Sequence, residues 1–253
     1  MFLRLLHRVR AAPAAWSRRL PAQCAVCRSW PSQPLCEACI ARFAQPVPRC
    51  RTCAMALAPT PSEPAHSADT RQCGRCLREP PPLHACRAAV SYGYPWTQVL
   101  TQFKFQAQPG WARSLATLLH STPWVDPALE QADWVVPMPL SGERLRSRGF
   151  NQSLQLARAL APARTRADVL LRLRDTPAQH ALPRAERLRN VQGAFAVDPL
   201  VAAQVRDARV VLVDDIMTTG ATLFAAARAL RDAGAAQVTG LVVARTEASA
   251  PPG

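Results

Sequence analysis

The sequence lacks long hydrophobic runs and contains almost no lysine. No run of about 18 apolar residues occurs in its 253 residues, so we do not expect a transmembrane helix. The apolar stretches near the start are too short and interrupted for a secretory signal, and we therefore expect a cytoplasmic protein. Lys104 is the only lysine, so arginine supplies nearly all of the positive charge. We find no Ser-His-Asp or Cys-His arrangement that would indicate a covalent nucleophile.

Basic residues outnumber acidic ones by 31 to 17, which gives a formal net charge of +14. If eight cysteines bind two zinc ions as thiolates, each site adds −2 and the net charge falls to about +10. This charge suits a phosphate-bearing ligand, nucleic acid or an anionic surface. A general compositional preference for arginine and alanine would explain much of the excess positive charge without any such partner. Residues 142–190 hold 11 arginines and four acidic residues and should form a positive face. Residues 1–23 read as a basic tail rather than a membrane-binding helix.

All nine cysteines fall between residues 24 and 86, and eight of them form four C-x-x-C pairs. A single pair would be compatible with redox chemistry. Four pairs within 53 residues are typical of metal sites, because each pair directs two thiolates at one ion. The gaps between the pairs predict two zinc ribbons with four thiolate ligands each. The first would use Cys24, Cys27, Cys36 and Cys39, and the second would use Cys50, Cys53, Cys73 and Cys76.

The sequence leaves two alternatives to this assignment open. The first C-x-x-C pair could share a metal with the third pair instead of the second. The cysteines could also form disulfides, which the lack of an export signal disfavours. A site with four thiolates leaves no open coordination position, so both zinc ions are expected to be structural. Cys86 is left over and is interpreted as a structural thiol.

The strongest functional signal lies in residues 210–223, which read VVLVDDIMTTGATL. Residues 210–213 predict a short buried strand, and residues 222–233 predict a helix after a turn of small residues. The N–H groups at a helix N-terminus bind anions, whereas the carboxylates of Asp214 and Asp215 suit sugar hydroxyls or a hard cation. The stretch therefore predicts a site for a ribose 5-phosphate. A plain strand with acidic helix caps would explain neither the doubled acid nor the three threonines.

This stretch resembles the motif with which type I phosphoribosyltransferases bind 5-phosphoribosyl 1-pyrophosphate (PRPP). The resemblance implies that Asp214 and Asp215 bind the ribose hydroxyls and are the catalytic residues. It implies that the 5-phosphate is bound by a loop of five residues, Thr218, Thr219, Gly220, Ala221 and Thr222. It further implies that a nitrogen nucleophile displaces pyrophosphate from ribose C1, with Mg²⁺ as cofactor. The protein would supply placement and charge stabilisation rather than covalent chemistry.

A second anion-binding corner is predicted where a strand at residues 133–138 runs into the sequence PMPLSGERLRSRGFNQ. Prolines restrict this loop, and three arginines follow it ahead of a helix at residues 153–160. Cysteine ribbons followed by V-P-M-P-L, R-G-F-N-Q and D-D-x-x-T-T-G resemble the pattern of the ComF family over residues 24–245. The resemblance implies that Pro139, Leu140 and Arg144 hold the pyrophosphate of PRPP. It makes Arg148 and Asn151 site residues of unassigned role.

The ComF family is similar to phosphoribosyltransferases and includes GntX-type proteins and competence proteins linked to DNA uptake in natural transformation. Residues 176–195 look like the family's Q-x-x-L…R-x-x-N…F segment, where phosphoribosyltransferases place a mobile lid that excludes water. The lid candidates are Gln179, Arg187 and Asn190, and the alternative is a solvated basic loop. Lys104 is a candidate phosphate contact, with a chance surface lysine as the alternative.

The order of the predicted elements favours an α/β fold. Strands are predicted at residues 88–94, 133–138, 168–174, 210–213 and 238–245, with helices at 96–105, 111–120, 153–160 and 222–233. With the resemblance, this order predicts a type I phosphoribosyltransferase-like parallel sheet with helices on both faces and the site at its carboxyl edge. We expect a basic tail at residues 1–23, a double zinc ribbon at 24–86, a phosphoribosyltransferase-like domain at 87–247 and a disordered tail at 248–253.

Two functions from different classes remain open at this point. The first is a PRPP-dependent transferase linked to DNA uptake. The second is a non-catalytic protein that senses PRPP or a nucleotide. It would bind single-stranded DNA or a helicase-like partner through its zinc ribbons and positive face. The aromatic pattern of an RNA-binding RNP motif is absent from the sequence.

The four C-x-x-C pairs predict about two zinc ions per chain. Elemental analysis of the purified protein should return this stoichiometry, because each group of four thiolates holds one ion. Cys86→Ser is the matched control and should leave the zinc content unchanged, since Cys86 lies outside the four pairs. A measured content of one zinc ion or none would contradict the assignment of two ribbons.

Overall fold

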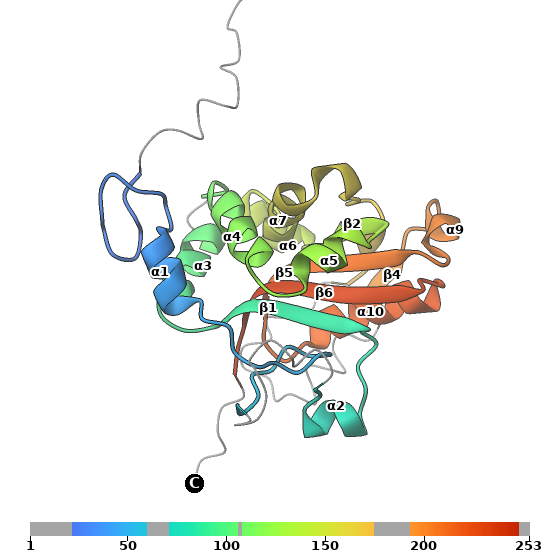
Figure 1. Cartoon of the computed structure of the whole chain (residues 1–253). Coiled ribbons are helices and arrows are strands. Elements are labelled where there is room, and N and C mark those ends of the chain that lie inside the picture. The colour runs from blue at the N-terminus through green and yellow to red at the C-terminus, as the bar shows by residue number, and fades with distance from the viewer. Residues whose placement is uncertain (1–21, 60–70, 106–107, 175–192, 248–253) are drawn as a thin grey trace, which may run out of the picture.

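The computed structural model in Figure 1 describes residues 22–59, 71–105, 108–174 and 193–247. Its centre is a four-stranded sheet in the order β1-β6-β5-β2, in which every neighbouring pair is parallel. The strands are β1 (Ala85–Ser91), β2 (Trp134–Pro137), β5 (Arg209–Met217) and β6 (Gln237–Arg245). The parallel α/β sheet that the sequence predicts is confirmed.

The central strand β5 is buried on both faces, because its apolar run alternates between two hydrophobic clusters. Val210 and Leu212 belong to the cluster on one face of the sheet, and Val211 and Val213 belong to the cluster on the other face. A strand that is covered on both faces has no solvent-facing positions, which explains the unbroken run of apolar residues ahead of the acidic pair.

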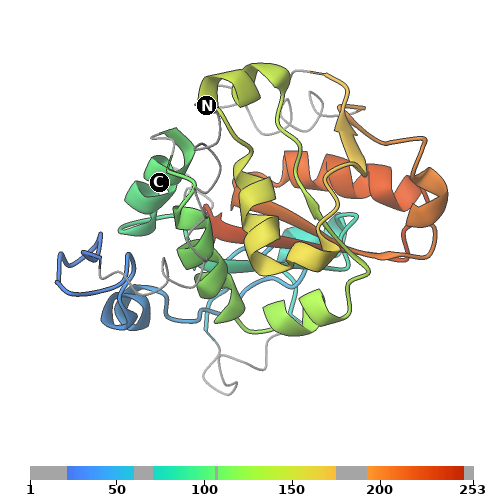
Figure 2. The ribbon, with the colours of Figure 1, turned by 90° about the horizontal axis from the view of Figure 1, so that it is seen from above.

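Helices cover the two faces of this sheet, as the sequence predicts. One face packs against α3 (Trp96–Phe105), α4 (Trp111–His120), α5 (Val125–Glu130) and α7 (Gln152–Leu160). The opposite face packs against α10 (Ala221–Asp232) and the second group of cysteines. Figure 1 shows α4, α5 and α7 above the sheet and α10 below it. In Figure 2, seen from above, the blue segment with the first cysteines lies beside the sheet rather than over it.

Most predicted elements lie close to their predicted positions. Helices α3 and α4 begin and end at the predicted residues, and α7 and α10 each begin one residue early. The strand predicted at residues 88–94 lies three residues earlier, as β1. Ala85 and Cys86 therefore pair with Thr239 and Gly240 of β6 and belong to the main sheet.

The strand predicted at residues 168–174 was wrongly assigned to the parallel sheet. Only β3 (Leu170–Arg172) forms there, and it pairs antiparallel with β4 (Phe195–Val197) in a separate two-stranded sheet. The partner strand β4 was not predicted as a strand, because Phe195 falls at the end of the segment that was interpreted as a lid. A run of three residues carries too little periodicity to reveal which sheet it joins.

The loop predicted after β2 contains a short helix, α6 (Gly142–Arg148), which corrects the prediction. Ser141 caps this helix by accepting a hydrogen bond from the Arg144 N–H at 3.3 Å. Gly149 ends it in the left-handed region at a φ of +78°. The capping serine and the terminating glycine are both visible in the sequence. The helix has only seven residues, which are too few to show a helical repeat of apolar positions.

The remaining short elements are α1 (Glu37–Phe43), α2 (Gly74–Arg78), the 3-10 helix η2 (Pro162–Arg164) and α9 (Ala202–Val205). The cysteine-bearing segments are joined to the sheet domain by buried contacts. Trp96 Nε1 donates to the Phe43 carbonyl at 3.0 Å, and the Cys86 N–H donates to the Arg51 carbonyl at 2.6 Å. Among the described helices, none combines the length and the apolar character needed to cross a bilayer.

Candidate functional site

The two acidic residues lie at the carboxyl edge of the parallel sheet. The sequence predicted that Asp214 and Asp215 follow the strand. β5 instead continues to Met217, so both residues are part of the strand. Asp214 is half-buried, and Asp215 is only 5% exposed. Since parallel strands end at the same edge, the segment after β2 reaches this edge too, where the Met138 N–H donates to the Val213 carbonyl at 2.9 Å.

Each carboxylate of the pair has its own partners. Ser153 Oγ and the Asp215 N–H both donate to Asp214 Oδ1 at 2.9 Å. Lys104 Nζ lies 3.1 Å from Asp215 Oδ1, which also accepts from the Ile216 N–H at 2.7 Å. The Lys104 side chain is 18% exposed and paired, so it is not a free surface lysine. Asp215 Oδ2 is buried and accepts no hydrogen bond from the part of the chain that the structure describes.

Burial and the adjacent charge of Asp215 raise the pKa of Asp214 to about 6. The ammonium of Lys104 and the hydrogen bonds from the Asp215 N–H and Ser153 lower the pKa of Asp214, but they do not offset these two effects. The acid pair therefore holds more negative charge than its surroundings neutralise, which favours a ligand that brings hydroxyl donors or a cation.

The turn after the acid pair is built on Gly220, which precedes α10 at a φ of +84°. A Cβ at this position would lie 2.5 Å from Met217 Cε and 2.7 Å from Phe224 Cζ, so the turn requires glycine. Thr219 Oγ1 accepts a hydrogen bond from the Ala221 N–H at 3.3 Å, which fixes the entry into the helix.

The predicted phosphate loop and the acid pair lie on adjoining parts of one edge. Thr218 is exposed, and Thr219 and Thr222 are half-buried, so the three hydroxyls differ in their access to solvent. The loop leads into a helix of 12 residues, whose first N–H groups have no partner within the helix. These donors and the helix dipole would favour an anion beside the carboxylates.

The corner after β2 carries two arginines, Arg144 and Arg148, and the second of them lies near the acid pair. Pro139 and Leu140 are half-buried, and Arg144 lies in the first turn of α6. Arg148, at the end of α6, places its guanidinium 5.1 Å from the centre of the Phe105 ring. Burial lowers the pKa of Arg148, whereas the nearby carboxylates of Asp215 and Asp214 raise it. Arg148 therefore lies within electrostatic reach of the acid pair.

Asn151 uses both ends of its side chain inside the protein. Its Oδ1 accepts from the Leu154 N–H at 3.2 Å and caps α7, and its Nδ2 donates to the Met138 carbonyl at 3.0 Å. These two bonds fasten the start of α7 to the segment after β2. Asn151 thereby places Ser153 against Asp214 and positions the corner.

Not every predicted site residue can be placed. The lid candidates Gln179, Arg187 and Asn190 lie outside the described residues. A surface cavity of about 260 Å³ opens at the opposite, amino-terminal end of the sheet, beside His84, Arg209 and Gln237. Its lining contains no carboxylate and no residue of the predicted phosphate loop, so it does not match the ligand that the sequence predicts.

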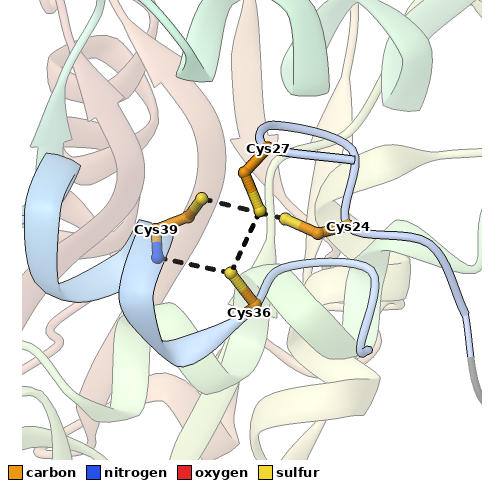
Figure 3. Close-up of side chains that lie close together, drawn as sticks. All are labelled: Cys24, Cys27, Cys36 and Cys39. Carbon is orange, nitrogen blue, oxygen red and sulfur yellow. Dashed lines mark hydrogen bonds between the residues drawn. The ribbon is translucent and has the colours of Figure 1, made fainter. Parts of the chain in front are cut away.

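The eight paired cysteines form two groups with the predicted membership, and within each group the Sγ atoms lie within 4.8 Å of one another. In the first group, shown in Figure 3, Sγ–Sγ distances are 3.6 Å for Cys27–Cys36 and 3.8 Å for Cys24–Cys39. In the second group, Cys53–Cys73 is 3.7 Å. Tetrahedral ligands with Zn–S bonds of about 2.3 Å lie about 3.8 Å apart, so both groups fit a zinc ion.

This grouping decides between the alternatives that the sequence left open. The first C-x-x-C pair converges with the second, so the interleaved pairing is wrong. None of the nine cysteines is disulfide-bonded, which contradicts the disulfide alternative. Backbone N–H groups support the sulfur atoms, since Cys39 N donates to Cys36 Sγ at 3.4 Å and Cys73 N donates to Cys50 Sγ at 3.3 Å. Such bonds favour the thiolate form that a metal binds.

Comparison with known proteins agrees with this arrangement. The family model of the phosphoribosyl transferase domain matches residues 149–252. DNA utilization protein YhgH of Salmonella typhimurium is 33% identical over 218 residues, which cover 84% of this chain and 90% of that protein. Competence protein F of Haemophilus influenzae is 31% identical over 177 residues (66% and 76%), and competence protein ComFC of Bacillus subtilis is 29% identical over 173 residues (65% of each). The chain belongs to the ComF family.

The structure of this ComF family protein adds two residues that the sequence did not single out. Ser153 directly follows the R-G-F-N-Q signature, and its hydroxyl bonds Asp214. Arg245 ends the apolar run of β6 and donates at 3.1 Å to the Met217 carbonyl, which directly precedes the predicted phosphate loop. The sequence shows an arginine at the end of an apolar strand, but the burial of this arginine and its partners come from the structure.

The ComF family protein should not tolerate Gly220→Ala. The added Cβ would enter occupied space on a backbone with positive φ, so we expect the free energy of unfolding to fall by about 1–3 kcal/mol in denaturant titrations. Gly110→Ala is the matched control, because Gly110 has a φ of −56° and its added Cβ would meet no atom within 4 Å. Its effect should stay within about 0.5 kcal/mol or be stabilising. Equal losses in the two variants would contradict the steric explanation.

Asp214→Asn should stabilise the ComF family protein in a pH-dependent way. The folded pKa of about 6 exceeds the ordinary value of 3.8, so the folded state keeps a proton that the unfolded state has already released. Wild-type stability therefore falls between about pH 4 and pH 6, whereas asparagine mimics the protonated acid throughout. Urea titrations should show a variant advantage of about 1–3 kcal/mol above pH 6 that vanishes near pH 4. An advantage that is independent of pH would contradict this account.

Proposed function

We propose that this ComF family protein binds PRPP with Mg²⁺ at the carboxyl edge of its sheet and acts as a phosphoribosyltransferase. The observation that supports this most is the acid pair of β5 lying next to the N-terminus of α10. Carboxylates accept hydrogen bonds from hydroxyls, whereas helix N–H groups donate to phosphate. The two features prefer opposite ligand groups, and a ribose 5-phosphate carries both within one small molecule.

The acid pair also supports a divalent cation. Asp215 Oδ2 is buried and accepts no hydrogen bond from a described residue, while Oδ1 is held by Lys104. A fixed carboxylate oxygen of this kind is a ligand that Mg²⁺ accepts alongside waters and phosphate oxygens. Mg²⁺ bound there with PRPP would neutralise charge on the pyrophosphate.

The remaining site residues match the leaving group. In the transfer, a bond forms between the nitrogen nucleophile and ribose C1, and the C1–O bond breaks so that pyrophosphate departs with the electron pair. Arg144 and Arg148 of α6 would stabilise this charge, and Pro139 and Leu140, which lie between β2 and α6, would line the approach of the pyrophosphate. The acid pair opposes the positive charge that grows on the sugar ring. Gln179, Arg187 and Asn190 stay predicted lid residues.

The relatives suggest where this activity would serve. Their names describe a DNA utilization protein and competence proteins, so we propose a role in the uptake or use of DNA. Nine free cysteines suit a reducing compartment, which supports the cytoplasm as the location.

A second function is favoured by the placement of the first cysteine group. This segment lies beside the sheet and next to α3 in Figure 1, and Figure 2 shows that it is not packed over a face of the sheet. It offers a surface for single-stranded DNA or a helicase-like partner, together with exposed arginines such as Arg146 and Arg158. In this reading the site senses PRPP or a nucleotide without turnover.

Titration calorimetry with PRPP and Mg²⁺ tests the proposed site. The wild-type protein should bind, and Asp214→Asn and Asp215→Asn should each weaken binding by tenfold or more, which is about 1.4 kcal/mol or more. Asp133→Asn is the matched control, because the Asp133 carboxylate accepts from the Arg209 N–H at the opposite end of β5, at 2.8 Å. It should bind like the wild type. Absence of heat with the wild-type protein would reject the proposed ligand.

Isotope exchange between labelled pyrophosphate and PRPP separates the two functions. In the presence of its acceptor, a transferase should run the reaction in both directions, so that labelled pyrophosphate displaces the base from the product and appears in PRPP. Asp214→Asn should abolish this exchange. Tight PRPP binding without exchange for any nucleobase tested would favour the sensing function.

A further inference from the structure

A buried arginine links the second cysteine group to the phosphate loop. Arg245, the last residue of β6, is 0% exposed. Its Nε donates to the Cys53 carbonyl at 2.9 Å, and its Nη1 donates to the Met217 carbonyl at 3.1 Å and to the Thr218 carbonyl. The same Nη1 donates to the Thr246 carbonyl at 2.6 Å. One guanidinium thus holds three segments that lie far apart in the sequence.

The carbonyls of Met217 and Thr218 belong to the turn that enters the phosphate loop. Each carbonyl shares a planar peptide group with the N–H of the next residue, Thr218 or Thr219, so the orientation of these carbonyls sets the direction of the first N–H groups of the loop. The Thr246 N–H also donates to the Met217 carbonyl, at 3.0 Å. Removing the guanidinium would leave the Met217 carbonyl with the Thr246 N–H alone and would take this donor from the Cys53 and Thr218 carbonyls, which is costly in the protein interior.

Cys53 connects this arginine with the metal group. The residue supplies one sulfur of the second group and also the carbonyl that accepts from Arg245. Arg245 forms no ion pair with a carboxylate among the described residues, and a buried unpaired charge is unfavourable. Four thiolates around one zinc ion carry a net charge of −2, which would supply the missing counter-charge.

The two cysteine groups differ in their relation to the site. Cys50, Cys53 and Cys76 belong to the same hydrophobic cluster as Met217 and Ala221 of the loop region. The first group packs at the side of the sheet near α3, and the structure gives it no hydrogen bond to the loop among the described residues. Loss of metal from the two groups should therefore have different consequences.

We propose that Arg245 is a positioning residue through which the second cysteine group, and not the first, sets the conformation of the phosphate loop. Occupation of the second metal site then controls the affinity of the loop for phosphate. The effect on loop conformation follows from the hydrogen bonds of Arg245 to the Cys53, Met217 and Thr218 carbonyls. The effect on phosphate affinity rests on the proposed function.

The central experiment is hydrogen exchange of the loop, read by mass spectrometry over residues 217–223. Arg245→Met should speed exchange in this loop by tenfold or more, while exchange in α4, zinc content and cooperative unfolding persist. Arg164→Met is the matched control, since Arg164 also donates to backbone carbonyls, of Leu129 and Glu130, far from the loop. It should leave loop exchange unchanged. Unchanged loop exchange in Arg245→Met would overturn the proposal.

A conservative variant separates positioning from general stability. Arg245→Lys keeps the charge but offers a single ammonium, which cannot reach the Cys53 carbonyl and the loop carbonyls together in the manner of a guanidinium. Loop exchange should fall between that of the wild type and Arg245→Met. Equal loop exchange in Arg245→Lys and the wild type would show that only the charge matters and would overturn the bridging role.

The metal groups are compared by single serine substitutions. Cys76→Ser should lower the zinc content by one and speed exchange of the loop, whereas Cys36→Ser should lower it by one and leave loop exchange as in the wild type. Equal effects of the two variants on the loop would contradict the assignment to the second group. If Cys76→Ser does not fold, Arg245→Met, which retains all eight ligands, still decides the question.

PRPP calorimetry on the same variants tests the effect on phosphate affinity. Arg245→Met should weaken binding by tenfold or more, and Arg164→Met should bind like the wild type. A wild-type protein that binds no PRPP while Arg245→Met loosens the loop would reject the proposed ligand and retain the positioning role. If Arg245→Met speeds exchange of the loop but binds PRPP as tightly as the wild type, the proposed control of phosphate affinity is rejected and the positioning role is retained.

Discussion

Two carboxylates on consecutive residues of a strand that is buried on both faces repel each other, and the surrounding elements are arranged around that repulsion. Lys104 reaches Asp215 from the end of α3, and Ser153 reaches Asp214 from the first turn of α7. A further contact joins these two helices, since Gln152 donates to the Lys104 carbonyl at 3.3 Å. Gln152 also accepts from Arg148 of α6 at 3.2 Å. The acid pair thus organises one whole side of the site.

These partners do not fully neutralise the acid pair. The pKa of Asp214 is raised to about 6, so near neutral pH its carboxylate is ionised at the cost of folding stability. A ligand that brings a cation and hydroxyl donors would relieve this repulsion on binding. The relief would add to the binding free energy. The same reasoning explains why a lone lysine in an arginine-rich chain lies here: a compact ammonium fits beside one carboxylate oxygen without covering the other.

The features that the sequence predicted correctly are local ones. The strand and helix on either side of the phosphate loop follow from an apolar run, a glycine turn and a helical repeat, all within residues 210–233. The membership of the two cysteine groups follows from short spacings, and Figure 3 shows the first of them converging on one point. In these cases the interacting residues are neighbours in the chain, so their spacing limits the geometry.

The features that it missed depend on contacts between distant residues. The pairing of β3 with β4, the salt bridge from Lys104 to Asp215 and the contact from Arg245 to Cys53 join residues that the sequence does not relate. Hydrogen bonds over 192 positions, as between Arg245 and Cys53, leave no periodic trace in a single chain. The acid pair could therefore be located from the sequence, but its partners could not.

Hydrogen bonds along one edge join the cysteine-rich segment to the sheet. β1 is an edge strand, and an exposed edge invites pairing with other chains. The Cys86 N–H of this edge donates to the Arg51 carbonyl, and Arg49 donates to the Ser91 hydroxyl at 3.0 Å. The segment that carries the second cysteine group thus covers the edge of the sheet on one side and holds Arg245 on the other. A metal ion that orders this segment would protect the sheet edge and support the phosphate loop through the same few residues.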